Sequence, residues 1–268
     1  MDYSGSLRKM KTEYNQQTGD INYFFNMDGQ AVCNMNELVG QEITLTFAGK
    51  INCTHCGKNI RKTYSDGLCY PCLIKLPQAD MCILKPEQCH FHKGTCRDEA
   101  WGLANCFIPH TLYLARSSNI KIGITRDHQH FTRWVDQGAS EAMAIGTFPN
   151  RLEVGLAEVA ISEKLSDKTN WRKMLTNDIT DKNFEDYVEI AKNTLDDEQK
   201  KHLLETRQTF QFNYPVNQYP EKVKSFKLDK CRFFSNVLTG IKGQYLIFGN
   251  EVINIRSHSG YGITLTTG

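Results

Sequence analysis

The sequence predicts an α+β protein built from several small modules. Both ends of the chain alternate apolar and polar residues in short runs, eight of the ten cysteines fall between residues 53 and 106, and residues 112–165 place two strand-like runs before a helix-like run. Period-two alternation is typical of strands, and apolar spacings of three and four are typical of helices. A chain of 268 residues is long enough for two or three such modules.

Residues 1–50 and 213–268 are each expected to form a β module. The first ends in the alternating run Ile43–Phe47, and the second contains Tyr245–Phe248 and Val252–Ile255, separated by a glycine-asparagine turn. Two short sheets at opposite ends of one chain would each leave strand edges exposed. We therefore expect strands from the two ends to pair into one small barrel or sandwich.

Residues 51–76 are predicted to form a zinc ribbon. Cys53 and Cys56 make one Cys-x-x-Cys pair, and Cys69 and Cys72 make a second pair after twelve intervening residues. A single pair would suffice for redox chemistry, so two pairs at this spacing favour a tetrahedral four-thiolate site. We expect these four cysteines to bind one structural Zn²⁺ ion.

Residues 77–110 contain a second group of thiols whose spacing matches no standard ribbon. The group consists of Cys82, Cys89, Cys96 and Cys106, and His90 and His110 lie close by in the sequence. The leading interpretation is a second zinc ion bound by the four cysteines, with His90 or His110 replacing one of them as a variant. An iron–sulfur cluster also takes four thiolates, and buried free cysteines are the third interpretation.

Residues 111–176 are predicted to form a small α/β module. The runs Leu112–Arg116 and Ile120–Thr125 are expected strands joined by a Ser-Ser-Asn turn, and Leu152–Leu165 is an expected helix. Four basic residues accompany the strands and fit contacts to nucleic-acid phosphates: Arg116, Lys121, Arg126 and Arg133.

This module resembles the GIY-YIG nuclease superfamily. Tyr113 stands where the superfamily has its first tyrosine, and Ile122-Gly123 with Thr125 matches the second motif. The resemblance implies an endonuclease that uses Mg²⁺ or Mn²⁺, with a downstream arginine and a glutamate on a helix. Carried over by position, it implies four catalytic residues: Tyr113, Lys121, Arg133 and Glu158. Many members have a second tyrosine where this chain has Lys121, and that departure bears on hydrolytic activity.

Each of these residues also has a purely structural interpretation. Tyr113 could be a core aromatic residue, and Arg133 could pair with Asp136 on its own helix. Glu158 competes with Glu153 and Glu163 for the place of the metal-binding carboxylate. Only the positions of these side chains in the fold can separate the alternatives.

Residues 177–212 are expected to form an acidic helical segment. Between Asn177 and Glu205 the chain carries nine acidic and four basic residues, and apolar residues keep helical spacing from about Asn183 to Phe210. Such a segment would lay one apolar stripe on the body and turn its charges to water.

Composition restricts the setting of the protein. Net charge is only +2, the longest apolar runs are far too short for a membrane helix, and residues 1–12 have no apolar core of a secretory signal. We therefore expect a cytoplasmic protein without a membrane partner. A reducing compartment makes clustered cysteines metal ligands rather than disulfides.

The whole chain also resembles a bacterial family whose function is not established. The matching stretches are the two cysteine pairs of residues 53–72, Gly94–Arg97, Trp101-Gly102, Val135–Ala139, Asp167–Trp171 and Gly240–Tyr245. Three hypotheses follow: a zinc-containing nuclease that acts on DNA or RNA, a module that binds nucleic acid without cutting it, and a zinc-stabilised scaffold for protein partners.

Overall fold

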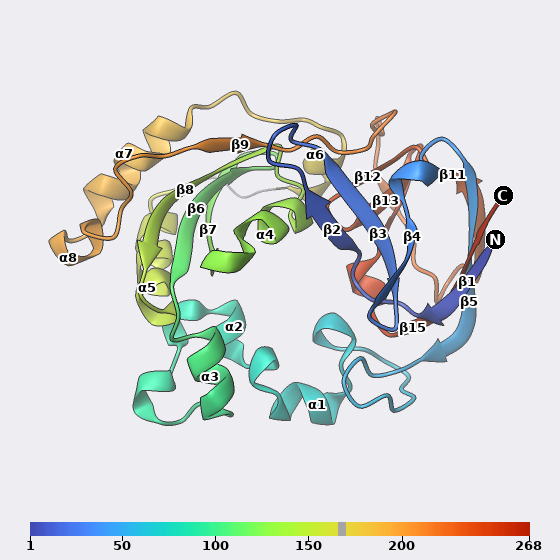
Figure 1. The fold of residues 1–268 in the computed structure, drawn as a ribbon, viewed down its shortest axis with the longest axis horizontal. Coiled ribbons are helices and arrows are strands. Elements are labelled where there is room, and N and C mark those ends of the chain that lie inside the picture. The colour runs from blue at the N-terminus through green and yellow to red at the C-terminus, as the bar shows by residue number, and fades with distance from the viewer. Residues whose placement is uncertain (166–169) are drawn as a thin grey trace.

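The computed structural model describes residues 1–165 and 170–268. Residues 166–169, which include part of the Asp167–Trp171 stretch, lie outside the described residues. The architecture is mixed α+β, as predicted, with four small sheets and short helices around them (Figure 1).

The central sheet carries the order β7-β6-β8-β9 and is antiparallel throughout. Its strands are β6 (His110–Arg116), β7 (Ile120–Arg126), β8 (Glu141–Phe148) and β9 (Thr209–Gln211). The turn Ser117–Asn119 joins β6 to β7, so the hairpin predicted from the sequence is confirmed. Because β7 is the outer strand, no strand of the described residues pairs with its other edge.

Helices cover both faces of the central sheet. Period-two alternation sends Leu112 and Leu114 into one core, while Tyr113 and Ala115 face another. The first core lies under α5 (Arg151–Ser162) and α7 (Phe184–Thr194), and the second lies against α4 (His130–Asp136) and the terminal strands. The side chain of Asn150 caps α5 by accepting from the Glu153 amide, so α5 begins where the sequence offers an N-cap.

Strands from the two ends of the chain pair in one sheet with the order β1-β15-β5-β11. Its members are β1 (Asp2–Ser6), β5 (Glu42–Ile51), β11 (Phe233–Val237) and β15 (Tyr261–Thr267). The expected pairing of the ends is therefore confirmed. The expected barrel is not: among the described residues every sheet is open, because separate sheets pack face to face around the shared core.

Two smaller sheets complete this half of the molecule. One has the order β2-β3-β4 and the other β10-β14-β13-β12. Their strands are β2 (Lys11–Tyr14), β3 (Ile21–Met27), β4 (Gln30–Asn34), β10 (Lys224–Ser225), β12 (Gly240–Lys242), β13 (Tyr245–Phe248) and β14 (Glu251–Asn254).

The acidic segment differs from the long helix that its composition suggests. α7 ends at Thr194, and Asp196 starts the short helix α8 (Asp197–Lys200) with a capping box that includes Gln199. After α8 the chain extends and adds β9 to the central sheet. The capping box starts a new helix and the pairing with β8 extends the chain, so the apolar residues at helical spacing do not form one continuous helix.

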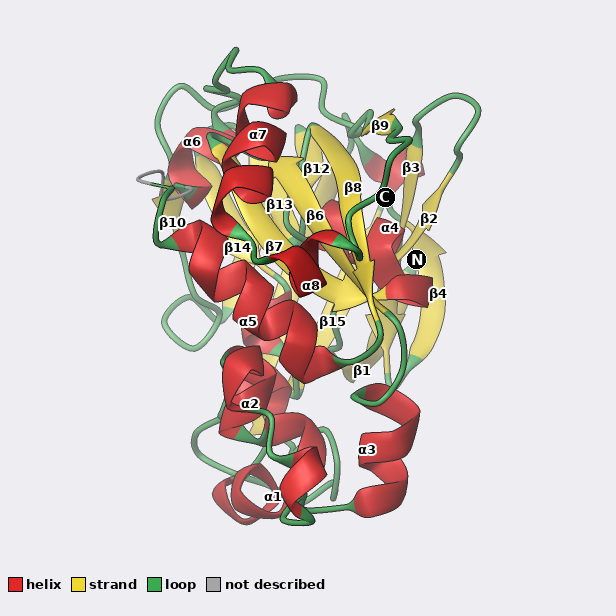
Figure 2. Ribbon diagram, turned by 90° about the vertical axis from the view of Figure 1, so that its left-hand side faces the viewer, coloured by secondary structure: helices red, strands yellow, loops and turns green. Residues whose placement is uncertain are grey.

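The cysteine-rich block lies at one end of the molecule, below the sheets in both views (Figures 1 and 2). It contains three short helices: α1 (Tyr70–Lys75), α2 (Met81–Leu84) and α3 (Glu99–Asn105). The remaining helix, α6 (Trp171–Leu175), is capped by Asn170, whose side chain accepts from the Arg172 amide.

Candidate functional site

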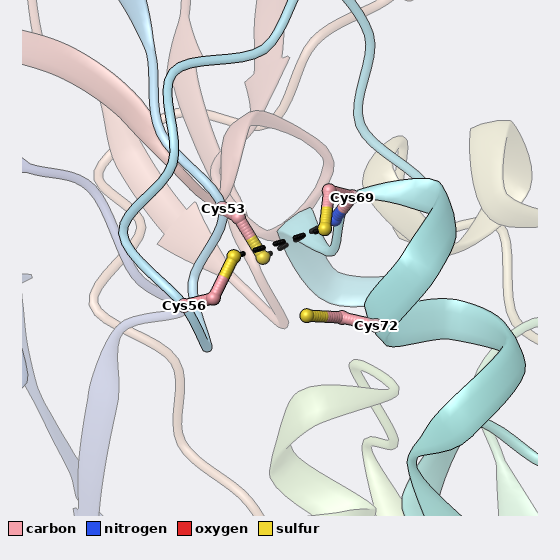
Figure 3. Close-up of side chains that lie close together, drawn as sticks. All are labelled: Cys53, Cys56, Cys69 and Cys72. Carbon is pink, nitrogen blue, oxygen red and sulfur yellow. Dashed lines mark hydrogen bonds between the residues drawn. The ribbon is translucent and has the colours of Figure 1, made fainter.

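The first four cysteines converge on one point. Their sulfur atoms all lie within 4.8 Å of one another, and Figure 3 shows the thiols of both pairs facing a common centre. The Sγ atoms of Cys56 and Cys69 are 3.8 Å apart. A tetrahedral site with zinc–sulfur bonds of about 2.3 Å has edges of roughly 3.8 Å. Cys53, Cys56, Cys69 and Cys72 could therefore hold a metal ion such as zinc.

Backbone amides prepare one of these thiols to be a thiolate. Burial raises the pKa of Cys53, but N–H groups of Cys56, Cys69 and His55 point at its sulfur and together lower the pKa to about 6. The amide of Cys69 donates to Cys53 Sγ at 3.2 Å. Since the thiolate is the form that binds metal, this amide arrangement fits a ligand to a cation.

The surroundings of this cluster differ from the expected ribbon. Cys53 and Cys56 lie in a loop after β5, whereas Cys69 precedes the first residue of α1 and Cys72 lies in its first turn. Only isolated bridges join the intervening residues, such as Tyr64 with Leu68. The zinc ribbon is thus not confirmed, because the second pair is carried by a helix start rather than by a second hairpin.

This module, residues 52–76, is attached to the terminal sheet. Asp66 accepts two hydrogen bonds from Arg256, at 2.7 and 2.9 Å. Gly67, with a φ of +90°, lies so close to this region that a Cβ would come within 2.6 Å of the Ser259 carbonyl oxygen. Only glycine fits such a position. Gly67 therefore allows the loop between the two cysteine pairs to lie directly against Ser259.

The second group of thiols lies beside α5. Cys82, Cys89 and Cys106 are buried, Cys96 is partly exposed, and all four line one cavity of about 10 Å³. His90 also lines this cavity, whereas His110 does not; its Nδ1 atom hydrogen-bonds the Ile108 carbonyl oxygen and burial lowers its pKa to about 4.

A larger cavity, of about 310 Å³, opens along the free edge of β7. We call it the β7-edge cleft. It is lined by all four residues that the nuclease resemblance singles out, each from a different element: Tyr113 on β6, Lys121 on β7, Arg133 on α4 and Glu158 on α5. Arg126 also lines it. The sequence separates the outermost of these positions by 45 residues, and the fold brings them to one hollow.

Gly123 explains how a buried tyrosine reaches this cleft. Tyr113 pairs with Gly123 across β6 and β7, and a Cβ on Gly123 would lie 2.6 Å from the Tyr113 hydroxyl. The ring therefore crosses the space that a side chain would fill, and its hydroxyl donates to Gln137 Oε1 at 3.1 Å. Burial raises the pKa of Tyr113, an effect that the charge and hydrogen bond of Arg133 partly offset. Gly123 therefore leaves the space that the Tyr113 side chain occupies.

The cleft shifts the pKa values of two of its other groups. Burial raises the pKa of Glu158 to about 7, against the opposing charge of Arg133. Burial, with help from the charge of Arg133, lowers the pKa of Lys121 to about 8. Groups that titrate near neutral pH in a cleft are typical of sites that bind ions or transfer protons.

The structure also separates the competing structural interpretations. Asp136, the suggested partner of Arg133, instead binds Lys9 at 2.6 Å. Glu153 hydrogen-bonds its own helix cap at Asn150, and Glu163 is exposed beyond the end of α5. Of the three glutamates considered, Glu158 lines the cleft.

Arg116 lies away from the cleft. Its Nε atom is 3.1 Å from a Glu141 carboxylate oxygen, and its guanidinium donates to the carbonyl oxygens of Thr180 and Lys182. Arg116 is three residues beyond Tyr113 on the same strand, so strand alternation turns it to the opposite face. Of the four predicted phosphate-binding residues, the fold brings Lys121, Arg126 and Arg133 together.

Sequence reasoning missed Arg151, which also lines the cleft and is only 8% exposed. A signal existed: Arg151 is the first residue of α5, where the helix dipole disfavours a cation. A basic residue at that position suggests a role outside the helix itself. Gln137, which holds the Tyr113 hydroxyl, carried no comparable signal.

No helix in the described ranges combines the length and the apolar character needed to cross a membrane. No curated protein and no solved structure matches the chain. A model of the family described as protein of unknown function (DUF2797) matches residues 40–263. Since this match spans most of the chain, including both cysteine groups and the β7-edge cleft, the chain belongs to the DUF2797 family.

Proposed function

We propose that this protein binds nucleic acid in the β7-edge cleft and cleaves its phosphodiester backbone with the help of Mg²⁺ or Mn²⁺. One observation carries the proposal: Tyr113, Lys121, Arg133 and Glu158, from four separate elements, line a single cavity. These are the residue types that phosphodiester hydrolysis requires, namely a carboxylate for a cation, cations for the phosphate and a group that accepts a proton.

Charge in the cleft supports a phosphate ligand. Lys121, Arg126, Arg133 and Arg151 line it, against the single carboxylate of Glu158. Arginine binds phosphate oxygens with two parallel N–H groups, and the exposed side chain of Arg133 can be reached by such a ligand. Both DNA and RNA carry this phosphate chemistry, so the cleft accounts for binding to the backbone rather than for the choice of sugar.

Glu158 is the residue that would hold the divalent cation. Mg²⁺ sites commonly use one or two carboxylates together with substrate phosphates, so the partly buried carboxylate of Glu158 among basic side chains fits. When bound, the cation would neutralise phosphate charge and lower the pKa of a coordinated water. At neutral pH Glu158 is only partly ionised, because burial raises its pKa to about 7.

Two other side chains suit proton transfer and positioning. Lys121 has a pKa lowered to about 8, so a neutral amine that accepts a proton from water is accessible near physiological pH. Tyr113, whose pKa burial raises, stays protonated and uses its hydroxyl to orient groups beside Arg133. Lysine at the position of the second tyrosine therefore still supplies acid–base chemistry.

A structural zinc ion at Cys53, Cys56, Cys69 and Cys72 completes the proposal. The 3.8 Å separation of the Cys56 and Cys69 sulfurs and the amide donated to Cys53 support it. All ten cysteines are unpaired thiols, which supports the reducing environment of the cytoplasm as the setting.

The second candidate function is binding without cleavage. Lys121 favours it, because a protonated lysine at this position would bind a phosphate instead of activating water. Binding of this kind would weaken steeply with salt, since each phosphate contact releases condensed counterions.

The test uses labelled single-stranded DNA, duplex DNA and RNA with Mg²⁺ or Mn²⁺. Wild-type protein is expected to cut at least one of them. Glu158→Gln is expected to abolish cutting while retaining binding, and Arg133→Ala to slow cutting roughly 100- to 1,000-fold. Glu163→Gln, on the exposed end of the same helix, is the matched control and keeps full activity.

Two results would count against cleavage. Salt-sensitive binding with no cutting of any substrate assigns the cleft to the second candidate function. Cutting that persists in Glu158→Gln points to a contaminating nuclease and removes the proposed role of this carboxylate.

A further inference from the structure

The second group of cysteines forms an ion-sized chamber. Cys82, Cys89 and Cys106 pack together in one buried cluster, and Cys96 joins them in the lining of one cavity. The cavity lined by these four thiols measures about 10 Å³, a space for a single ion or water. Four thiols around such a space match a closed structural metal site better than an apolar packing cluster.

Asp80 and His90 line the same cavity as the four thiols. The ligand atoms of Asp80, Cys82 and His90 lie within 4.8 Å of one another. Asp80, however, pairs with Arg97 at 2.6 Å and caps α2 through the Cys82 amide. His90 is held by Thr95 through Nδ1 at 2.8 Å. These hydrogen bonds orient the loop that carries the thiols.

The same module forms one wall of the β7-edge cleft. Ile83, Leu84 and Pro86 line the cleft directly. Gly155 of α5 lies so close to this wall that a Cβ would come within 2.6 Å of the Pro86 carbonyl carbon. Helix α5, which carries Glu158, therefore rests on the loop between the first two cysteines of the group.

Two arginines of the cleft are fixed by backbone groups of this module. Arg151 donates from its amide to the Cys106 carbonyl oxygen at 2.8 Å, and from its guanidinium to the carbonyl oxygens of Cys82 and Ile83 at 3.2 and 2.9 Å. Arg126 donates to the Asn105 carbonyl oxygen at 3.1 Å. Two of these acceptors belong to cysteines of the group itself, so the conformation of the thiol cluster sets the position of the arginines.

We propose that Cys82, Cys89, Cys96 and Cys106 bind a second zinc ion, and that this ion holds Arg126 and Arg151 in place at the cleft. The metal site follows from the thiol cluster alone. Only the consequence for ligand binding rests on the proposed function of the cleft.

The metal site is tested by counting zinc in purified protein by mass spectrometry. Wild type is expected to hold two zinc ions per chain, and Cys82→Ser and Cys106→Ser one each. Cys33→Ser and Cys231→Ser lie outside both groups and keep two. One zinc ion in wild type, two in Cys106→Ser, or iron with acid-labile sulfide in wild type would each overturn the assignment. If the buried variants fail to fold, Cys96→Ser at the partly exposed ligand is expected to lose the second ion more readily to a chelator.

The coupling to the cleft is tested by hydrogen exchange and by binding of a fluorescent DNA strand. Loss of the second ion in Cys96→Ser is expected to speed exchange of the Arg151 amide at least tenfold and to weaken DNA binding at least tenfold. Arg151→Met is expected to weaken binding while keeping two zinc ions. Unchanged exchange overturns the coupling. Faster exchange in a protein whose wild type binds no DNA supports the coupling and contradicts only the proposed function.

Discussion

The two groups of four cysteines contact different parts of the molecule. The first, Cys53 to Cys72, is attached to the sheet formed by the ends of the chain, through Asp66 with Arg256 and the close approach of Gly67. The second, Cys82 to Cys106, rests against α5 and touches the cleft. The first therefore lies against the terminal strands, and the second borders the candidate site.

The position of a thiol cluster in the fold, rather than the identity of its ligands, decides which region of the protein is disturbed when a cysteine is replaced. A ligand removed from the first group should disturb a peripheral module and leave the cleft intact. A change in the second group or in its contact with α5 should reach the cleft.

The largest effect is expected from a ligand of the first group. Cys69→Ser should lose the bound metal and unfold residues 52–76, because structural zinc sites of this type contribute about 10 to 16 kcal/mol of apparent binding energy. Hydrogen exchange resolved by peptide measures this. We expect faster hydrogen exchange in residues 52–76 of Cys69→Ser and unchanged exchange in β6 and β7. The control Cys33→Ser should change exchange in neither region. Full protection in Cys69→Ser would contradict the metal's role.

A smaller effect is expected where the second group meets α5. Glycine in a helix normally becomes more stable as alanine by about 0.5 to 1 kcal/mol. At Gly155 the sign should reverse, with a loss of about 1 to 3 kcal/mol, because the new Cβ would strike the backbone of Pro86 and Glu87. Urea denaturation measures the change. Leu156→Ala, at an exposed neighbouring position, should stay within about 0.5 kcal/mol, and a stabilised Gly155→Ala would show that α5 does not rest on this loop.

The Glu158 carboxylate in the cleft should lower the stability of the folded protein. The pKa of Glu158 is raised in the folded state, so its favourable contribution is complete below its ordinary pKa of 4.5 and is lost as pH rises through about 7. In the absence of a divalent cation, Glu158→Gln should therefore stabilise the protein by on the order of 2 kcal/mol at about pH 8. This gain should shrink as pH falls toward about 5.5. Equal stability of both proteins at every pH would mean that the carboxyl group is well solvated.

The smallest effect is expected at the link between the first group and the terminal sheet. Asp66→Asn removes the ion pair with Arg256, in which both side chains are roughly half exposed. Such pairs contribute about 0 to 1 kcal/mol and are screened by salt. Denaturation in low and high salt should reveal a small difference that fades with salt. A loss that persists in high salt would assign a larger structural role to this contact.

Much of this fold follows from local patterns. Alternation predicted the hairpin of β6 and β7 and strands at the two ends, and the helix expected over Leu152–Leu165 covers most of α5. The four cysteines of the first group were also predictable, because two Cys-x-x-Cys pairs suit one tetrahedral ion. The resemblance led us to expect Tyr113, Arg133 and Glu158 at one site, and all three side chains line the β7-edge cleft.

Other features depend on contacts distant in sequence. The break after Thr194 requires the capping box of Asp196 and a free position beside β8, and neither is visible from helical spacing. The contact between the second cysteine group and α5 depends on Gly155, which reads in the sequence only as a weak point in a helix. Arg116 was placed with the other basic residues by proximity in the chain, although strand alternation already separated it from Tyr113.

The pairing of β1 with β15 has a consequence for how the chain acquires its structure. The register runs from Asp2 opposite Thr266 to Ser6 opposite Gly262. Strand β1 therefore cannot pair until residues more than 250 positions later in the chain are in place. Contacts between such distant positions form slowly, because the conformational entropy of a very long loop is lost before the contacts contribute favourable energy. The cysteine-rich middle, whose contacts are short in sequence, can become ordered beforehand. The edge of β5 that pairs with β15 remains open to wrong partners until β15 is in place.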